Sequence, residues 1–187
     1  MAKPSAPPKS PTKSETALGS LTADELSCVL GELLAAQPEL QDQAERVAST
    51  LLTTVSVEQV TADVESALTW ISLDALAARA GRVRGRGYVH ECEAAWELVD
   101  EAIAPFRSDL DRRAALGLLD AAGNLAVGII AGLYRARAPE MGTVLAYAGD
   151  NTQMEVAAQI LNRAGELGVP VPDDAADAHW PRWSDLR

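Results

Sequence analysis

The sequence is poor in aromatic residues. It has one Phe, three Tyr and four Trp among 187 residues, and its apolar side chains are mostly alanine, leucine and valine. This composition argues against an aromatic-rich β core and favours closely packed helices. The length fits one ordinary domain, or one domain with tails, that buries a core without disulfides or a metal.

Cysteine and long apolar runs are also scarce. The two cysteines, Cys28 and Cys92, lie far apart in the sequence, and residues 1–14 (MAKPSAPPKSPTKS) lack the apolar segment of a secretory signal. Both observations favour a reducing cytoplasm. The longest apolar run, residues 125–134, is well short of the roughly twenty residues that cross a bilayer. We therefore expect a cytoplasmic protein without a membrane span.

Basic residues are outnumbered by acidic ones, 16 to 27, for a formal charge of −11. This charge argues against a general nucleic-acid binder, which needs a basic face for the phosphates. The imbalance is concentrated in residues 14–78, where Arg46 is the only basic residue. Two explanations stay open: pairing with the arginines of the second half of the chain, or attraction of a basic partner.

Helix start signals divide the first half of the chain. Thr22 and Glu25 have the spacing of a capping box and open a helix whose apolar residues recur at helical spacing. Pro38 suits the first position of a second helix. Ser56 opens a third helix, and Ser72 opens a short fourth that ends at Gly81.

The second half predicts longer helices. We expect a helix over residues 88–106 that Pro105 helps to stop. A long helix begins at Ser108 and runs to about Ala138, and a short helix follows from Pro139. The last helix begins at Asp150 or Asn151 and ends near Gly168.

These elements predict an all-α fold of about seven or eight helices, arranged as antiparallel helical pairs in a bundle or a short helical-repeat-like array. The expected domains are a disordered tail over residues 1–16, a helical domain over residues 17–169 and an irregular tail over residues 170–187.

Four glycines fall inside the expected long helix, where each costs about 1 kcal/mol relative to alanine. They are Gly117, Gly123, Gly128 and Gly132. Gly128 and Gly132 share one face by i, i+4 spacing, so another helix is expected to approach closely there. That helix belongs either to the same chain, which we favour, or to a second subunit.

Residues 79–88 (RAGRVRGRGY) are the one local anomaly, with four arginines and three glycines. The first interpretation is a helix end at Gly81 and a tight connection whose arginines pair with Glu91, Glu93 or Glu97. The second is an anion site just before a helix N-terminus, where the helix dipole favours negative charge. Its candidate residues are Arg82, Arg84, Gly85, Arg86, Gly87 and Tyr88.

Motifs for catalysis are sparse. His90 and Cys92 point to different faces of a helix, so neither a zinc site nor a cysteine nucleophile is expected, and Cys92 should be buried on the Trp96 face. Acidic pairs such as Glu93 and Glu97 have the spacing of a general acid–base pair, but a solvated helix face gives the same spacing. No cofactor and no metal are expected.

Four runs resemble uncharacterised helical proteins of actinobacteria and other bacteria, some relatives of which accompany SWIM zinc-finger proteins. The runs are residues 79–82 (RAGR), 87–98 (GYVHECEAAWEL), 128–135 (GIIAGLYR) and 147–150 (YAGD). The resemblance extends over about residues 21–168 and implies a helical domain, with no activity and no site residue. The Cys-x-Cys and Cys-x-His ligands of a SWIM finger are absent.

The sequence therefore favours a protein-interaction or scaffolding module without enzymatic activity. Its partner is expected to be a protein, a second copy of the same chain included, rather than nucleic acid or a membrane. A binding domain for an anionic small molecule or nucleic acid, acting through residues 79–88, is the alternative, and an enzyme comes third.

Overall fold

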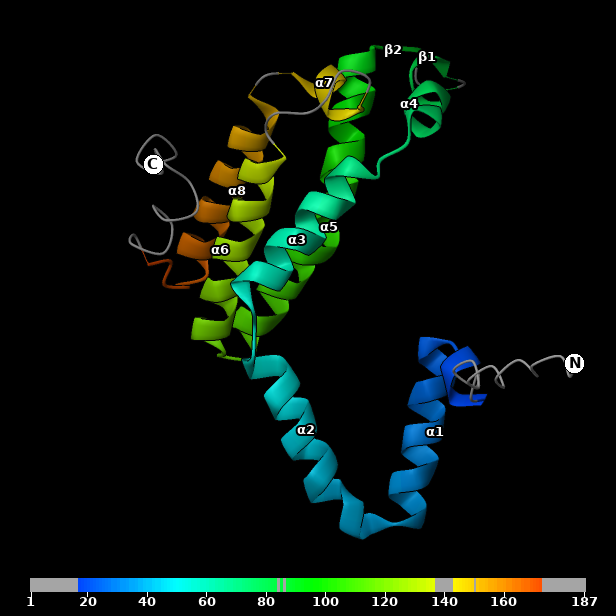
Figure 1. Cartoon of the computed structure of the whole chain (residues 1–187), viewed down its shortest axis with the longest axis vertical. Helices are drawn as coiled ribbons and strands as arrows, with labels where there is room; N and C mark the ends of the chain where they lie inside the picture. The colour runs from blue at the N-terminus through cyan, green and yellow to red at the C-terminus, as the bar shows by residue number, and fades with distance from the viewer. Residues whose placement is uncertain (1–16, 84, 86, 137–142, 150, 173–187) are drawn as a thin grey trace, which may run out of the picture. The chain divides into compact units, whose positions relative to one another are not determined.

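The structure is a computed structural model that describes residues 17–83, 85, 87–136, 143–149 and 151–172. Within these residues the chain forms eight α-helices, two short 3-10 helices and one two-stranded hairpin (Figure 1). The predicted all-α fold is confirmed. None of the described helices is both long enough and apolar enough to cross a membrane. Nearly all of the two expected tails, residues 1–16 and 173–187, falls outside the described residues.

The helices belong to two compact units, residues 1–48 and residues 49–187. Unit 1 contains a 3-10 helix (η1, Ala17–Ser20), α1 (Ala23–Ala36) and a second 3-10 helix (η2, Pro38–Leu40). It also contains most of α2 (Gln41–Thr53), which continues into unit 2. From the sequence we expected one helical domain over residues 17–169.

The predicted capping box opens α1. The Thr22 hydroxyl accepts a hydrogen bond from the Glu25 amide (3.3 Å), and the Glu25 carboxylate accepts one from the Thr22 amide (2.8 Å). Two of the amides that a helix start leaves unpaired are thereby satisfied. Pro38 begins η2, so the second α-helix starts three residues later, at Gln41, than its proline suggested.

Unit 2 contains the remaining elements. Ser56 and Ser72 cap α3 (Val57–Thr69) and α4 (Leu73–Arg79), as predicted. The chain continues through β1 (Gly81–Val83), β2 (Gly87–Val89), α5 (Glu91–Ala115) and α6 (Leu119–Arg135). It ends with the one-turn α7 (Leu145–Ala148) and α8 (Thr152–Glu166). The short helix expected from Pro139 falls partly outside the described residues.

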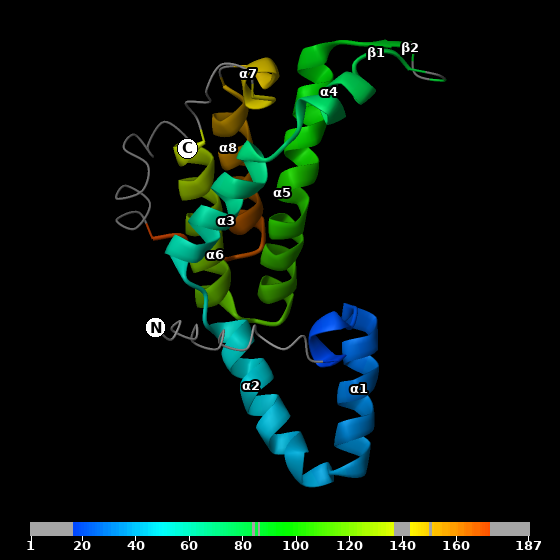
Figure 2. The same cartoon turned by 45° about the vertical axis from the view of Figure 1, so that its right-hand side comes forward.

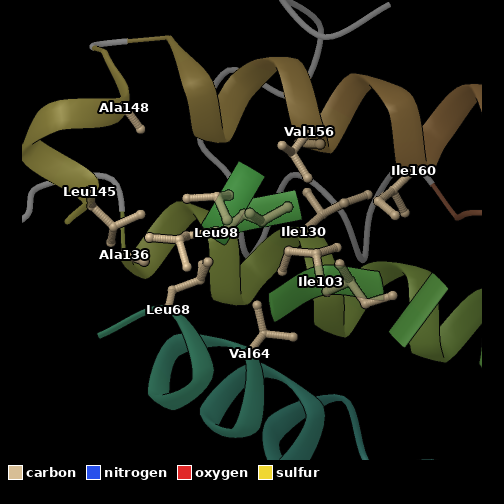
Figure 3. Close-up of a cluster of buried hydrophobic side chains, with 14 of the residues drawn as sticks. Val64, Leu68, Leu98, Ile103, Ile130, Ala136, Leu145, Ala148, Val156 and Ile160 are labelled. Atoms are coloured by element: carbon tan, nitrogen blue, oxygen red, sulfur yellow. The ribbon is translucent and has the colours of Figure 1, made fainter. Parts of the chain in front are cut away.

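Helix α6 is the centre of unit 2. It packs against α3, α5 and α8, and Figure 2 shows it among these helices. Between Ala121 and Leu133 every α6 residue except Asn124 is buried. Figure 3 shows Ile130 of α6 pointing into a core shared by Val64, Ile103 and Ile160. A helix that is apolar all round must be covered on all sides, which explains its central place.

Helices α3 and α6 pack closely against each other in unit 2. A Cβ added to Gly128 would lie 2.6 Å from the Val60 Cβ, and one added to Gly132 would lie 2.6 Å from the Val64 Cβ. The residue numbers rise together on both helices, so α3 and α6, which are not consecutive in the chain, pack in parallel. Internal packing at Gly128 and Gly132 is therefore confirmed, and it explains why glycine is present there.

Two predicted boundaries in the second half are wrong. Pro105 does not stop a helix but lies inside α5, which runs for 25 residues. Ser108 likewise lies inside α5 rather than at the start of the next helix. The break comes at Gly117, whose φ of 74° is one that glycine adopts at little cost. Gly117 therefore separates α5 from α6 instead of lying within a long helix.

The α5 backbone around Pro105 has side-chain support. Proline has no amide hydrogen, so the helix loses one hydrogen bond there and its ring crowds the preceding turn. The Arg107 guanidinium donates a hydrogen bond to the Asp100 backbone carbonyl (3.0 Å) and also pairs with the Asp100 carboxylate. This contact spans the proline turn and stabilises the helix across it.

Candidate functional site

A two-stranded β-hairpin lies between α4 and α5, where the two interpretations of the sequence were a helix end with a tight connection and an anion site. Strands β1 and β2 are antiparallel, with Gly81 opposite Val89, Arg82 opposite Tyr88 and Val83 opposite Gly87. Gly81, Gly85 and Gly87 have φ values of 91°, 88° and 86°. Residues other than glycine rarely adopt such φ values, so the glycines at these three positions allow the hairpin to form.

The structure brings two of the predicted site residues together. Arg82 and Tyr88 face each other across the hairpin, and both are exposed. The Tyr88 ring also meets the His90 ring edge-on, with centroids 5.1 Å apart. Gly85 and Gly87 supply the turn geometry, whereas Arg84 and Arg86 lie outside the described residues.

Arg79 connects the base of the hairpin to α5. Its guanidinium makes two hydrogen bonds, of 2.7 and 2.6 Å, with the two carboxylate oxygens of Glu101. These bonds hold the pKa of Glu101 below its usual value. The geometry is that of a bidentate arginine–carboxylate pair, so this arginine has a positioning role. The expected pairing with Glu91, Glu93 or Glu97 stays a prediction.

The start of α5 is a poor place for an anion. His90 is the N-cap residue and makes no side-chain capping bond. Glu91 and Glu93 follow in the first turn and are exposed. Their carboxylates already interact favourably with the positive end of the helix dipole. A bound phosphate would meet two like charges, which weakens the argument for an anion site at this position.

The remaining candidates for chemistry do not form a site. Cys92 is exposed, not buried on the Trp96 face as predicted, and its thiol lies 3.7 Å from the Ala148 carbonyl. Ala95 and Val99, which follow Cys92 on the same face of α5, are buried. Among the described residues no group of three or more His, Cys, Asp or Glu side chains is placed to hold a metal.

Unit 1 has an exposed apolar face on the helix whose apolar residues recur at helical spacing. Neither α1 nor α2 has a buried residue. Leu26, Leu30 and Leu33 of α1 remain 41%, 51% and 49% exposed. Their spacing places them on one side of the helix, and we call them the leucine stripe. Val47 of α2 is exposed as well.

The leucine stripe has the residues of a helix contact, and about half of the surface of each leucine is exposed. Leucines at this spacing are typical of a helix face that packs on another element. In unit 2 the equivalent residues, such as Leu68 and Leu133, have almost no exposed surface. The spacing of apolar residues in the sequence predicts that a helix has an apolar face, but it does not predict what covers that face. The exposed fraction of the side chains is what distinguishes the leucine stripe from the faces of the core helices.

Comparisons with protein-family models, with curated proteins and with solved structures returned no match. The fold and the arrangement of side chains are therefore the only basis for a functional proposal.

Proposed function

We propose that this protein is a non-enzymatic protein-interaction module that binds a partner through the leucine stripe of α1. In this proposal unit 2 is the self-supporting scaffold and unit 1 carries the binding surface. The exposure of Leu26, Leu30 and Leu33 is the observation that supports it. The free state of Cys28 and Cys92 is consistent with a place in the cytoplasm.

The energetics of α1 support a partner. The helix has 14 residues and no buried side chain, and isolated helices of that length are marginal in water. Fully burying a leucine contributes about 1.5–3 kcal/mol. Covering the exposed half of three leucines would therefore contribute roughly 2–4 kcal/mol, which is enough to stabilise α1 in a complex.

The alternative, anion binding by the hairpin, has less support. Arg82 is exposed beside Tyr88, but the carboxylates of Glu91 and Glu93 oppose an anion at the adjoining helix start. The resemblance to helical bacterial proteins implies no activity and adds no residue to either proposal.

Affinity purification tests the interaction function. The tagged, native full chain is compared with the variant Leu26→Ser/Leu30→Ser/Leu33→Ser, and the proteins that co-purify are identified by mass spectrometry. The control variant Leu116→Ser/Leu119→Ser/Met154→Ser removes exposed apolar side chains from unit 2. We expect a stoichiometric partner with the wild type and the control, lost only in the leucine-stripe variant. A partner set that the leucine-stripe variant retains would overturn the proposal.

A further inference from the structure

We infer that the occupant of the leucine stripe is a basic amphipathic α-helix of a partner protein. The inference rests on the proposed function and adds the chemistry of the partner. It follows from the charges that accompany the leucine stripe on unit 1.

Two glutamates line one edge of the leucine stripe. Glu25 directly precedes Leu26, and Glu32 directly precedes Leu33. Leu26 and Leu33 are seven residues apart, which is the repeat of a helix that packs along another helix. In such pairs the charged residues beside the apolar seam decide which partner fits. An edge of glutamates selects a helix with Lys or Arg at the facing positions.

The charge of the whole unit points the same way. Residues 17–48 contain six acidic residues and one basic residue, Arg46. All six acidic side chains are exposed: Asp24, Glu25, Glu32, Glu39, Asp42 and Glu45. Hydrogen bonds from the Thr22 backbone and hydroxyl hold the pKa of Glu25 below its usual value, so its carboxylate is ionised at neutral pH. A cationic partner is attracted and an anionic one repelled.

The other occupants of an apolar helix face fit less well. A second copy of the chain would bring the same acidic residues to the contact. An anionic lipid surface would be repelled by the same carboxylates. A basic helix satisfies both the apolar face and the acidic edge, which neither alternative does.

Two synthetic peptides test the inference on the full chain by fluorescence anisotropy. Both are three-heptad helices with leucine at the seam positions; one has lysine at the flanking positions and the other has glutamate. We expect saturable binding of the lysine peptide that weakens as salt rises, and no binding of the glutamate peptide. Equal binding of the two peptides, or binding of neither, would contradict the inference.

Matched variants separate the acidic edge from the general negative charge of the protein. The variant Glu25→Gln/Glu32→Gln removes the edge, and Gln at position 25 still completes the capping box. The control Asp120→Asn/Glu155→Gln removes two exposed carboxylates from unit 2. We expect roughly a two- to five-fold loss of lysine-peptide affinity for each edge carboxylate removed and no loss in the control. The same loss in both variants would mean unspecific attraction and refute the inference.

Sedimentation velocity of the chain without peptide distinguishes the two proposals. We expect a monomer. A dimer that dissociates in the variant Leu26→Ser/Leu30→Ser/Leu33→Ser would identify a second copy as the occupant. That result would overturn the basic-helix inference and leave the interaction function standing. If the wild type and the leucine-stripe variant bind the lysine peptide equally and both are monomers, both proposals fail.

Discussion

Val64 of α3 packs directly against Gly132 of α6, with no room for a side chain at Gly132. A Cβ on Gly132 would lie 2.6 Å from the Val64 Cβ and 2.8 Å from the Thr61 backbone oxygen. One turn earlier on α6, the Gly128 carbonyl accepts a 3.3 Å hydrogen bond from the Thr61 hydroxyl. The absent side chains let the two backbones approach, and this approach offsets the cost of glycine in a helix.

Replacing Gly132 with alanine should therefore destabilise the protein. The new methyl group would overlap Val64 and the α3 backbone, and such overpacking costs about 1–3 kcal/mol. Gly165→Ala in α8 is the control, because its Cβ would meet nothing within 4 Å. That substitution should be neutral or stabilise by up to about 1 kcal/mol. Urea unfolding followed by circular dichroism measures both, and equal free energies of unfolding would contradict this packing.

Trp96 and Trp70 should differ strongly when truncated. Trp96 is half-buried against the core, whereas Trp70, the C-cap residue of α3, is 83% exposed. Truncating a buried aromatic side chain to alanine typically lowers the free energy of unfolding by about 3–5 kcal/mol. We expect Trp96→Ala to approach the lower end of this range and Trp70→Ala to have little effect on thermal unfolding. A neutral Trp96→Ala variant would disprove its role as a core anchor.

The features that sequence predicted well are local ones. The Thr22–Glu25 capping box and the caps at Ser56 and Ser72 depend on residues three positions apart, so the sequence contains the whole interaction. The close approach of another helix at Gly128 and Gly132 also followed from the i, i+4 spacing of the two glycines. These features require no knowledge of which distant segment lies nearby.

The features that sequence did not predict involve long-range contacts. Pro105 would stop an isolated helix, but α5 continues because its following residues, such as Leu110, are buried in the core. The parallel pairing of α3 with α6 joins segments that are far apart in the chain. Helix spacing correctly assigned an apolar face to α1, but whether anything covers Leu26, Leu30 and Leu33 depends on the rest of the molecule. The sequence therefore predicted the apolar spacing of the candidate binding surface but not its exposure.

Arg113 should contribute more to stability than its neighbour Arg112. The Arg113 guanidinium is almost fully buried, pairs with Asp109 and donates a hydrogen bond to the Leu52 carbonyl in the last turn of α2. Arg113→Met leaves that carbonyl without its arginine partner and should lower the free energy of unfolding by about 1–3 kcal/mol.

Arg112→Met is the matched control. Arg112 also pairs with Asp109, but its side chain is half exposed, so its loss should cost about 0–1 kcal/mol. Chemical denaturation of both variants checks the difference. If Arg112→Met lowers the free energy of unfolding as much as Arg113→Met, the hydrogen bond to Leu52 is not the source of the stability.

Asp109 should make the stability of the protein sensitive to acid. Partial burial acts to raise its pKa, but the hydrogen bonds from Arg112 and Arg113 outweigh that effect, so the pKa is lower than its ordinary value near 3.8. A carboxyl whose folded-state pKa is lowered stabilises the protein fully above its unfolded-state pKa. That contribution is lost as the pH falls through the folded-state pKa. The Asp109→Asn variant should therefore be less stable than the wild type by the largest amount at neutral pH. This difference in stability, which we call the gap, should narrow below about pH 4.

Thermal unfolding between pH 7 and pH 2.5 measures this gap, and the Arg113→Met background identifies its cause. Arg113 donates one of the hydrogen bonds that lower the pKa of Asp109. Without it, the folded-state pKa of Asp109 should move back toward its ordinary value, because fewer donors favour the ionised form. The change of the gap with pH should then be smaller in the Arg113→Met background than in the wild type. A gap with the same pH dependence in both backgrounds would show that Arg113 does not cause the acid sensitivity.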